Sequence, residues 1–199
     1  MIDATIAQRG GASSLAVDVV SDLVCPWCFI GKRKLEAALA ELARTEPALD
    51  VTIRWHPFEL NPDLPREGIP RATYLAQKFG GGARAADIYA RVKHVGETVG
   101  IPFRFDRIER QPNTFDGHRL VAWAQLRADP SSLVEQLFRA YFLDGRFIGD
   151  REELVAIAAE AGLSADGART MLESDAMRQM ITDETRESAM SRTADALER

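Results

Sequence analysis

Short apolar runs predict a strand–helix–strand unit near the start of the chain. Residues 15–20 and 51–55 are apolar and rich in β-branched side chains, which favours two buried strands. Leucines recur between these runs at the spacing of one helix face: Leu35, Leu39 and Leu42. A helix between two strands over residues 15–56 forms a βαβ unit, so we expect the two strands to run parallel.

Helical periodicity dominates the chain beyond this unit. Residues 57–70 hold four prolines and predict an irregular connector. A helical region over 71–174 and a C-terminal helix within 175–199 follow it. Residues 1–14 are interpreted as a loose leader, and Phe103–Phe105 as a short edge strand. The predicted helices cover 71–79, 84–99, 115–128, 131–143, 151–162, 165–173 and 175–198.

The pattern predicts too few strands for a sheet. Two parallel strands are not stable alone, because parallel sheets need both faces covered and usually contain more members. The βαβ unit therefore requires further strands, and the remaining pattern does not supply them.

Composition and charge narrow the class of protein. The 199 residues are 46% hydrophobic with a formal net charge of −5, which allows a real core and offers no basic surface for nucleic acid or an anionic membrane. The N-terminus lacks the pattern of a signal peptide, and no run reaches the roughly 20 apolar residues of a membrane span. We expect a soluble, cytoplasmic protein, in which a purely structural disulfide is uncommon.

The only two cysteines, Cys25 and Cys28, stand three positions apart where the predicted helix begins. Pro26 suits the first helical turn, where a missing N–H has no partner to lose. At the helix N-cap, unpaired N–H groups and the helix dipole favour a thiolate on Cys25, and such sites lower a cysteine pKa from ~8.5 to about 3.5–7.5. Cys28, one turn inward, could then resolve a mixed disulfide formed on Cys25.

Three neighbours are expected to modulate the redox potential of this pair. Pro26 and Trp27 separate the two sulfurs in the sequence. Lys32 is four residues beyond Cys28, hence on the same helix face, where its charge could favour the thiolate.

Other uses of the two cysteines are weaker hypotheses. A zinc site would need further ligands, but there is no second cysteine pair, and the three histidines (His56, His94 and His118) are scattered. A static disulfide is uncommon in a cytosolic chain, and two small buried apolar side chains are a further alternative. A CxxC motif at the start of a βαβ helix favours a redox-active dithiol, with no metal and no other cofactor.

The sequence also predicts the positions of two histidines and one phenylalanine. His56 ends the second predicted strand and could line the groove beside the thiols, although a capping or surface role is commoner. Asp116 and His118 follow Asn113 at a predicted helix start, and we expect that segment to pack the helical region against the CxxC helix. Phe29 is expected to point into the core.

Four motifs are spread along the chain: SDLVCPWCFIGKRKLE (21–36), FELNPDLPREG (58–68), NTFDGHRLVAWA (113–124) and LFRAYFLDGRFIGDREEL (137–154). Together they resemble the DsbA-like thioredoxin superfamily, most closely its cytoplasmic FrnE-type branch, which is grouped with 2-hydroxychromene-2-carboxylate isomerases. The resemblance implies an α/β fold in which a thioredoxin-like βαβ unit is interrupted by a large all-helical insertion. It also implies thiol–disulfide exchange on protein substrates through Cys25 and Cys28.

The chain departs from this family after the insertion. The family has a strand there whose cis-proline loop faces the CxxC, followed by a last strand and helix. Here the final proline is Pro130, and residues 175–199 read as a helix without a strand-like run, a truncated thioredoxin half. We therefore expect an incomplete sheet, a homo-oligomer formed through its exposed edge, and impaired exchange.

Three functions remain open at this point. The leading hypothesis is a protein thiol–disulfide oxidoreductase that acts on protein thiols and disulfides. The second is a glutathione-dependent isomerase or kappa-class transferase, although such enzymes generally do not need a resolving residue like Cys28. The third is a non-catalytic interaction module that keeps the helices without the catalytic groove.

Overall fold

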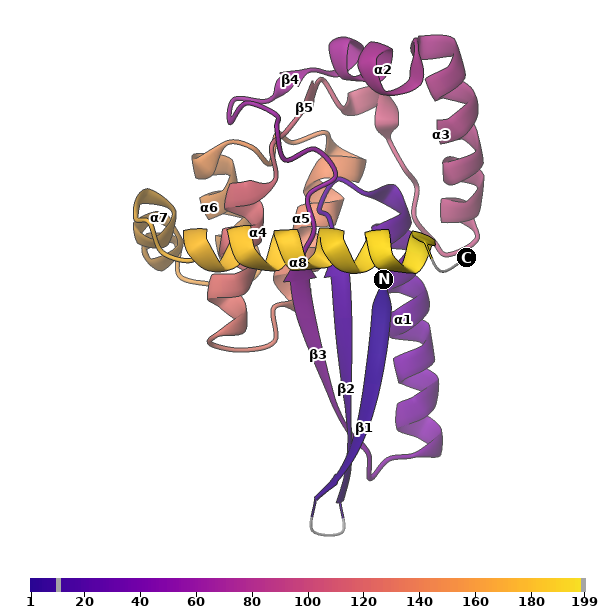
Figure 1. Cartoon of the computed structure of the whole chain (residues 1–199), viewed down its shortest axis with the longest axis vertical. Helices are drawn as coiled ribbons and strands as arrows, with labels where there is room; N and C mark the ends of the chain where they lie inside the picture. Colours follow the sequence, from indigo (N-terminus) through magenta and orange to yellow (C-terminus); the bar gives the residue numbers. More distant parts are fainter. Residues whose placement is uncertain (10–11, 198–199) are drawn as a thin grey trace.

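A computed structural model describes residues 1–9 and 12–197 (Figure 1). Its main sheet has three strands in the order β1-β2-β3, comprising β1 (Ile2–Arg9), β2 (Ala12–Ser21) and β3 (Asp50–Pro57). β2 and β3 are parallel, with Leu15 opposite Val51, which confirms both predicted strands and their direction. β4 (Ile69–Pro70) and β5 (Arg110–Gln111) form a separate antiparallel pair.

The leader predicted over residues 1–14 is wrong for the described part of that segment. Residues 2–9 form β1, which pairs antiparallel with β2 so that Ile2 lies opposite Val19. The run IDATIAQR alternates between apolar and more polar positions, and Gly-Gly follows it, a combination typical of a strand entering a hairpin. β1 gives the central strand β2 a partner on each side. Residues 10–11 and 198–199 of the predicted leader and C-terminal helix lie outside the described residues.

α1 (Pro26–Thr45) follows β2 and lies beside the sheet, as Figure 1 shows. Its first turns are anchored by Phe29, which is fully buried, as expected. The Phe29 ring stacks on Phe138 at 5.0 Å and meets Phe103 edge-on at 6.0 Å, so the CxxC helix is fixed directly against the helical insertion.

The insertion is helical over the predicted segments. Phe103–Phe105 is not a strand, because Phe103 is a buried loop residue packed under Phe29 and Phe105 already starts a 3-10 turn. The helices are α2 (Arg71–Phe79), α3 (Gly82–Glu97), α4 (Phe115–Gln125), α5 (Ser131–Arg139), α6 (Arg151–Glu160), α7 (Ala165–Glu173) and α8 (Arg178–Leu197), with a 3-10 turn η1 (Phe105–Arg107) and a π-helical turn η2 (Ala140–Asp144).

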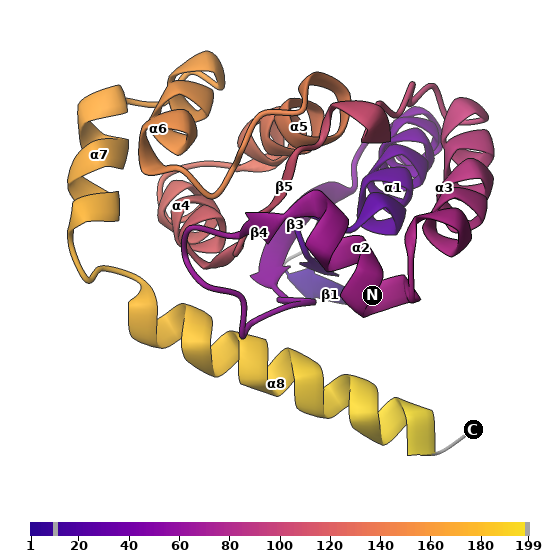
Figure 2. The same cartoon turned by 90° about the horizontal axis from the view of Figure 1, so that it is seen from above.

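α8 lies across the sheet on the face opposite α1 (Figure 2). Ile181 of α8 is fully buried, and Glu184 lies 3.5 Å from the His56 ring at the end of β3. From residue 112 to residue 197 the described chain forms helices and loops without a strand. The fold is therefore a mixed α/β thioredoxin-like arrangement with a small sheet and many helices. None of the described helices is long and apolar enough to cross a membrane.

Candidate functional site

The two cysteines occupy the first turn of α1, where the end of β2 delivers the chain. Cys25 is the N-cap and Pro26 the first helical residue, as predicted. The backbone N–H groups of Cys28 and Phe29 donate to the Cys25 carbonyl at 3.0 and 3.3 Å, which holds both sulfur-bearing residues on one turn. Both side chains are half-buried free thiols. The arrangement is that of a reduced dithiol at a helix start.

The two thiols interact strongly, and their interaction favours the negative charge on Cys28 over Cys25. A hydrogen bond from the Cys25 thiol, with further help from Ser21 and the Asp22 backbone, lowers the pKa of Cys28 to about 6 despite its burial. The same interaction with Cys28, added to burial, raises the pKa of Cys25. The helix-start geometry thus gives Cys28 a hydrogen-bond donor in the Cys25 thiol, and the expected attack by a Cys25 thiolate stays a prediction.

Ser21 and Asp22 were not predicted as site residues. Ser21 Oγ is buried and makes no hydrogen bond of good geometry within the described residues, yet it lies close enough to Cys28 to lower that pKa. Asp22 is 1% exposed, and its carboxylate raises the pKa of both cysteines. The signal available in the sequence was an aspartate in the mostly apolar run VVSDLV (19–24), three positions before Cys25.

Asp22 organises a buried polar cluster behind the thiols. Its Oδ2 accepts the Leu60 N–H at 2.7 Å, and its Oδ1 lies 3.5 Å from Nε2 of His118 on α4. Burial raises the pKa of Glu59. An interaction with His118 lowers this pKa, and the charge of Asp22 raises it. His118 therefore places α4 next to the residues that precede the CxxC turn, with its ring 3.5 Å from the Asp22 carboxylate.

Lys32 lies near the thiols but its charge is already neutralised. Its side chain is 3% exposed, and its ammonium donates to Glu36 and, at 2.9 Å, to Glu135 of α5. Arg33 also binds both carboxylates, so the four side chains fasten α1 to α5. Lys32 therefore links α1 to α5 beside the site, and its effect on the redox potential stays a prediction.

Trp27 is the exposed apolar side chain at the site. It is 52% exposed and lines two hollows. One, of about 200 Å³, also contacts Cys28, Gly31 and the first residue of the chain, Met1. The other, of about 760 Å³, runs along α3 past Val92 and is almost entirely apolar. The cysteine turn is thus flanked by apolar surface on both sides of one indole ring.

His56 does not face the thiols. Its Nε2 lies 2.8 Å from Oδ1 of Asp18 on β2, and Nδ1 faces Glu184 of α8. The carboxylate of Glu184, followed by that of Asp18, raises the pKa of His56 in spite of partial burial. The histidine therefore belongs to the contact between the sheet and α8. Within the described residues, no cluster of histidine, cysteine and carboxylate side chains could hold a metal ion.

The chain is similar to several known proteins. Protein YwbO of Bacillus subtilis (strain 168) is 27% identical over 176 residues, which cover 83% of this chain and 77% of YwbO. A probable DsbA oxidoreductase from Streptomyces coelicolor is 30% identical with a TM-score of 0.75, covering 88% of this chain and 75% of that one.

A more distant solved structure shares the fold. The cytosolic disulfide reductase DsbM from Pseudomonas aeruginosa is 19% identical with a TM-score of 0.62, covering 92% of this chain and 79% of its own. DsbM has also been solved with GSH. The family model of the DSBA-like thioredoxin domain matches residues 16–193, which include the CxxC turn, the insertion and most of α8. This chain therefore belongs to the DSBA-like thioredoxin domain family.

Proposed function

We propose that the protein is a thiol–disulfide oxidoreductase that acts on protein substrates through Cys25 and Cys28. The observation that carries this proposal is the coupled, half-buried dithiol at the start of α1, in which one sulfur has a pKa of about 6. A thiolate is the reactive form in exchange, and a pair with one low pKa supplies it at neutral pH. The family and its oxidoreductase neighbours support redox chemistry in general.

In the proposed mechanism the Cys28 thiolate first acts as a base. It takes the proton of Cys25 while the Cys25 sulfur attacks a substrate disulfide, forming a mixed disulfide and releasing one substrate thiolate. That thiolate takes the proton back from Cys28. The Cys28 thiolate then attacks the sulfur of Cys25, which closes the Cys25–Cys28 disulfide and releases the second substrate sulfur as a thiolate. The substrate gains two electrons and the protein loses two.

Trp27 and the apolar surfaces beside it support a polypeptide substrate. An exposed indole is an amphipathic contact for an extended chain, and the hollow along α3 offers apolar area beyond the sulfurs. A small disulfide would use little of this surface. We propose that unfolded or extended segments around a cystine are the preferred substrates.

Glutathione is the proposed small thiol partner, in a cytoplasmic setting. The support is a neighbour of shared fold, DsbM, which is described as cytosolic and was solved with GSH. Glutathione titration also separates this function from the glutathione-dependent isomerase. A covalent mixed disulfide on the cysteine pair supports the oxidoreductase, whereas saturable non-covalent binding without exchange supports the isomerase.

Single cysteine variants test the assignment of roles. Cys25→Ser should abolish insulin reduction in the presence of dithiothreitol, because the attacking sulfur is gone. Cys28→Ser removes the base, but it also removes the interaction that raises the pKa of Cys25, so Cys25 can ionise by itself and attack. Mixed disulfides should then accumulate because no second thiol resolves them, visible on non-reducing gels and by mass spectrometry. The reverse pattern would make Cys28 the attacking thiol. Unchanged insulin reduction in both variants would eliminate the oxidoreductase proposal.

A further inference from the structure

β3 is an edge strand whose outer backbone groups are only partly occupied. The Trp55 N–H donates to Gln125 Oε1 at 2.7 Å, and the Trp55 carbonyl accepts from Gln125 Nε2 at 3.2 Å, so Trp55 faces away from β2. The Phe58 N–H, three positions on, donates to Ser21 at the end of β2. Because strand residues alternate, Val51 and Ile53 present their backbone groups outward with Trp55. Within the described residues these two have no partner on that side.

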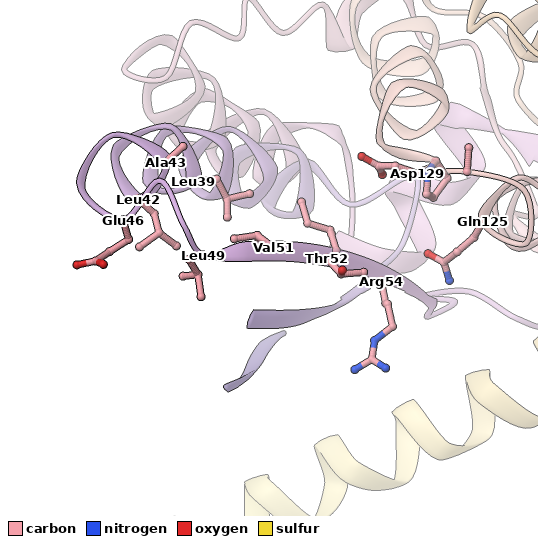
Figure 3. Close-up of a pocket in the computed structure, with 13 residues that line it drawn as sticks. Leu39, Leu42, Ala43, Glu46, Leu49, Val51, Thr52, Arg54, Gln125 and Asp129 are labelled. Carbon is pink, nitrogen blue, oxygen red and sulfur yellow. The ribbon is translucent and has the colours of Figure 1, made fainter. Parts of the chain in front are cut away.

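A groove of about 710 Å³ runs along this outer edge, between α1 and β3, and most of its lining is apolar (Figure 3). Figure 3 shows Leu39 and Leu42 reaching from α1 toward the strand, with Gln125 at the opposite end of the groove. The apolar residues that line it are Leu39, Leu42, Ala43, Leu49, Val51, Ile53, Ala128 and Pro130. Unpaired strand groups next to apolar side chains form a surface that an added strand would cover.

The charges on β3 determine which added strand can pair with it. Asp50 and Arg54 are exposed, four positions apart, and therefore on the same face of the strand. Arg54 is held on that face by Asp18 at 2.8 Å. If a second β3 lies antiparallel with Thr52 opposite Thr52, each Asp50 stands opposite an Arg54 of the other copy. The edge is thus complementary to itself in charge.

We propose that two copies of this chain pair antiparallel through β3, with the two-fold axis at Thr52. In this register Val51 of one copy lies opposite Ile53 of the other, and each such pair exchanges both of its N–H···O=C hydrogen bonds. The ladder stops at Trp55, where Gln125 already occupies the backbone. The leucine-lined grooves of both copies then lie on the same face of one six-stranded sheet and cover each other. This interface is independent of the redox proposal.

A proline scan of the two sheet edges tests the interface. We expect a dimer by analytical ultracentrifugation at micromolar concentration and a monomer for Ile53→Pro, since proline is tolerated where a strand N–H faces outward but cannot donate there. Ala4→Pro, at an outward position of β1, is the matched control and should remain dimeric. Circular dichroism verifies that both variants fold. A monomeric native chain, or a dimer lost only in Ala4→Pro, would overturn the proposal.

Charge and cross-linking test the register. Asp50→Lys places a lysine opposite Arg54 of the other copy at both symmetry-related positions. The dimer dissociation constant should rise about tenfold because like charges then face each other. In a Cys25→Ser/Cys28→Ser background, Thr52→Cys should form an intermolecular disulfide on mild oxidation, because residues at a non-hydrogen-bonded antiparallel site are close. Arg44→Cys, exposed on α1, is the control and should stay monomeric on a non-reducing gel. Equal cross-linking of both variants contradicts the proposed register.

Discussion

Two sulfurs at the start of α1 share what is effectively one charge. Cys28 holds it because the Cys25 thiol, Ser21 and the Asp22 backbone all favour the ionised sulfur, whereas the Asp22 carboxylate opposes it. At the scale of single residues, the acidity of the pair therefore depends on Ser21 and Asp22 as well as on the interaction between the two thiols. A coupled pair titrates as a unit, so these effects are read in its first ionisation.

Replacing Asp22 tests this balance. Asp22→Asn removes a negative charge that raises the pKa of both cysteines, so the first ionisation of the pair should move to a pH lower than about 6, by roughly 0.5. The new amide oxygen can still accept the Leu60 N–H. Thiolate absorbance against pH measures the change. The control is Asp63→Asn, at an exposed position in the connector 57–70, and it should leave the first ionisation of the pair unchanged. A shift to higher pH would contradict the role given to Asp22.

At the scale of elements, apolar side chains pack the helices side by side, and buried polar groups add specific hydrogen bonds between them. Arg119 of α4 is fully buried. Its guanidinium donates to Asp116 at 2.6 Å and to four backbone carbonyls at the end of α7 and the start of the next turn, those of Met171, Leu172, Ser174 and Ala176. The junction between α7 and α8 is thus fixed to α4 by one side chain.

Arg119→Met should destabilise the protein strongly. The thioether fills much of the space, but the carbonyls lose their donor, and breaking a buried charged network of this kind typically removes about 3–5 kcal/mol from the free energy of unfolding. Urea unfolding followed by circular dichroism measures this value. The control is Arg127→Met, an exposed residue near the end of α4 that donates to the Trp123 carbonyl and should lose less than about 1 kcal/mol. Similar losses in both variants would refute the special position of Arg119.

At the scale of the whole molecule, α8 closes the face of the sheet that α1 leaves open (Figure 2). Beside the apolar contact of Ile181, the contact includes His56, which lies between Asp18 of β2 and Glu184 of α8. Because the protonated imidazole is the form that both carboxylates stabilise, the docking of α8 is linked to pH.

The sign of this linkage is fixed by the direction of the shift. The pKa of His56 is raised above its ordinary value near 6.5, so its contribution is complete below about pH 6.5 and is lost as pH rises through the folded-state value. Amide hydrogen exchange in α8 should therefore become faster above about pH 6.5 than intrinsic exchange explains. His56→Gln should abolish this extra pH dependence. Identical profiles for the two proteins would show that His56 does not control the docking.

Much of this architecture could be predicted from residue patterns. The βαβ unit and the helices of residues 71–173 follow from periodicity, and the thiol pair follows from its position at a helix start. β1 was missed because a short, weakly apolar strand is stable only with β2 beside it. Phe103 was misassigned because alternation cannot distinguish an edge strand from a loop that buries one ring.

The electrostatics of the site could not be predicted in the same way. Asp22 meets Leu60 and His118, which are distant in the sequence, and its burial is decided by those segments. Which of the two sulfurs is ionised depends on where Ser21 and Asp22 lie relative to Cys28. Patterns of residue type along a chain carry no information of that kind.

Met1, which directly precedes β1, also has a practical meaning. The backbone of Met1 pairs with Val20 on the central strand, and its side chain forms part of the hollow beside Cys28. Any peptide fused ahead of Met1 would leave the fold next to the reactive sulfurs and would share their approach with incoming substrates. An affinity tag placed there would compete with substrates for the surface beside Cys28, so activity is best measured after its removal.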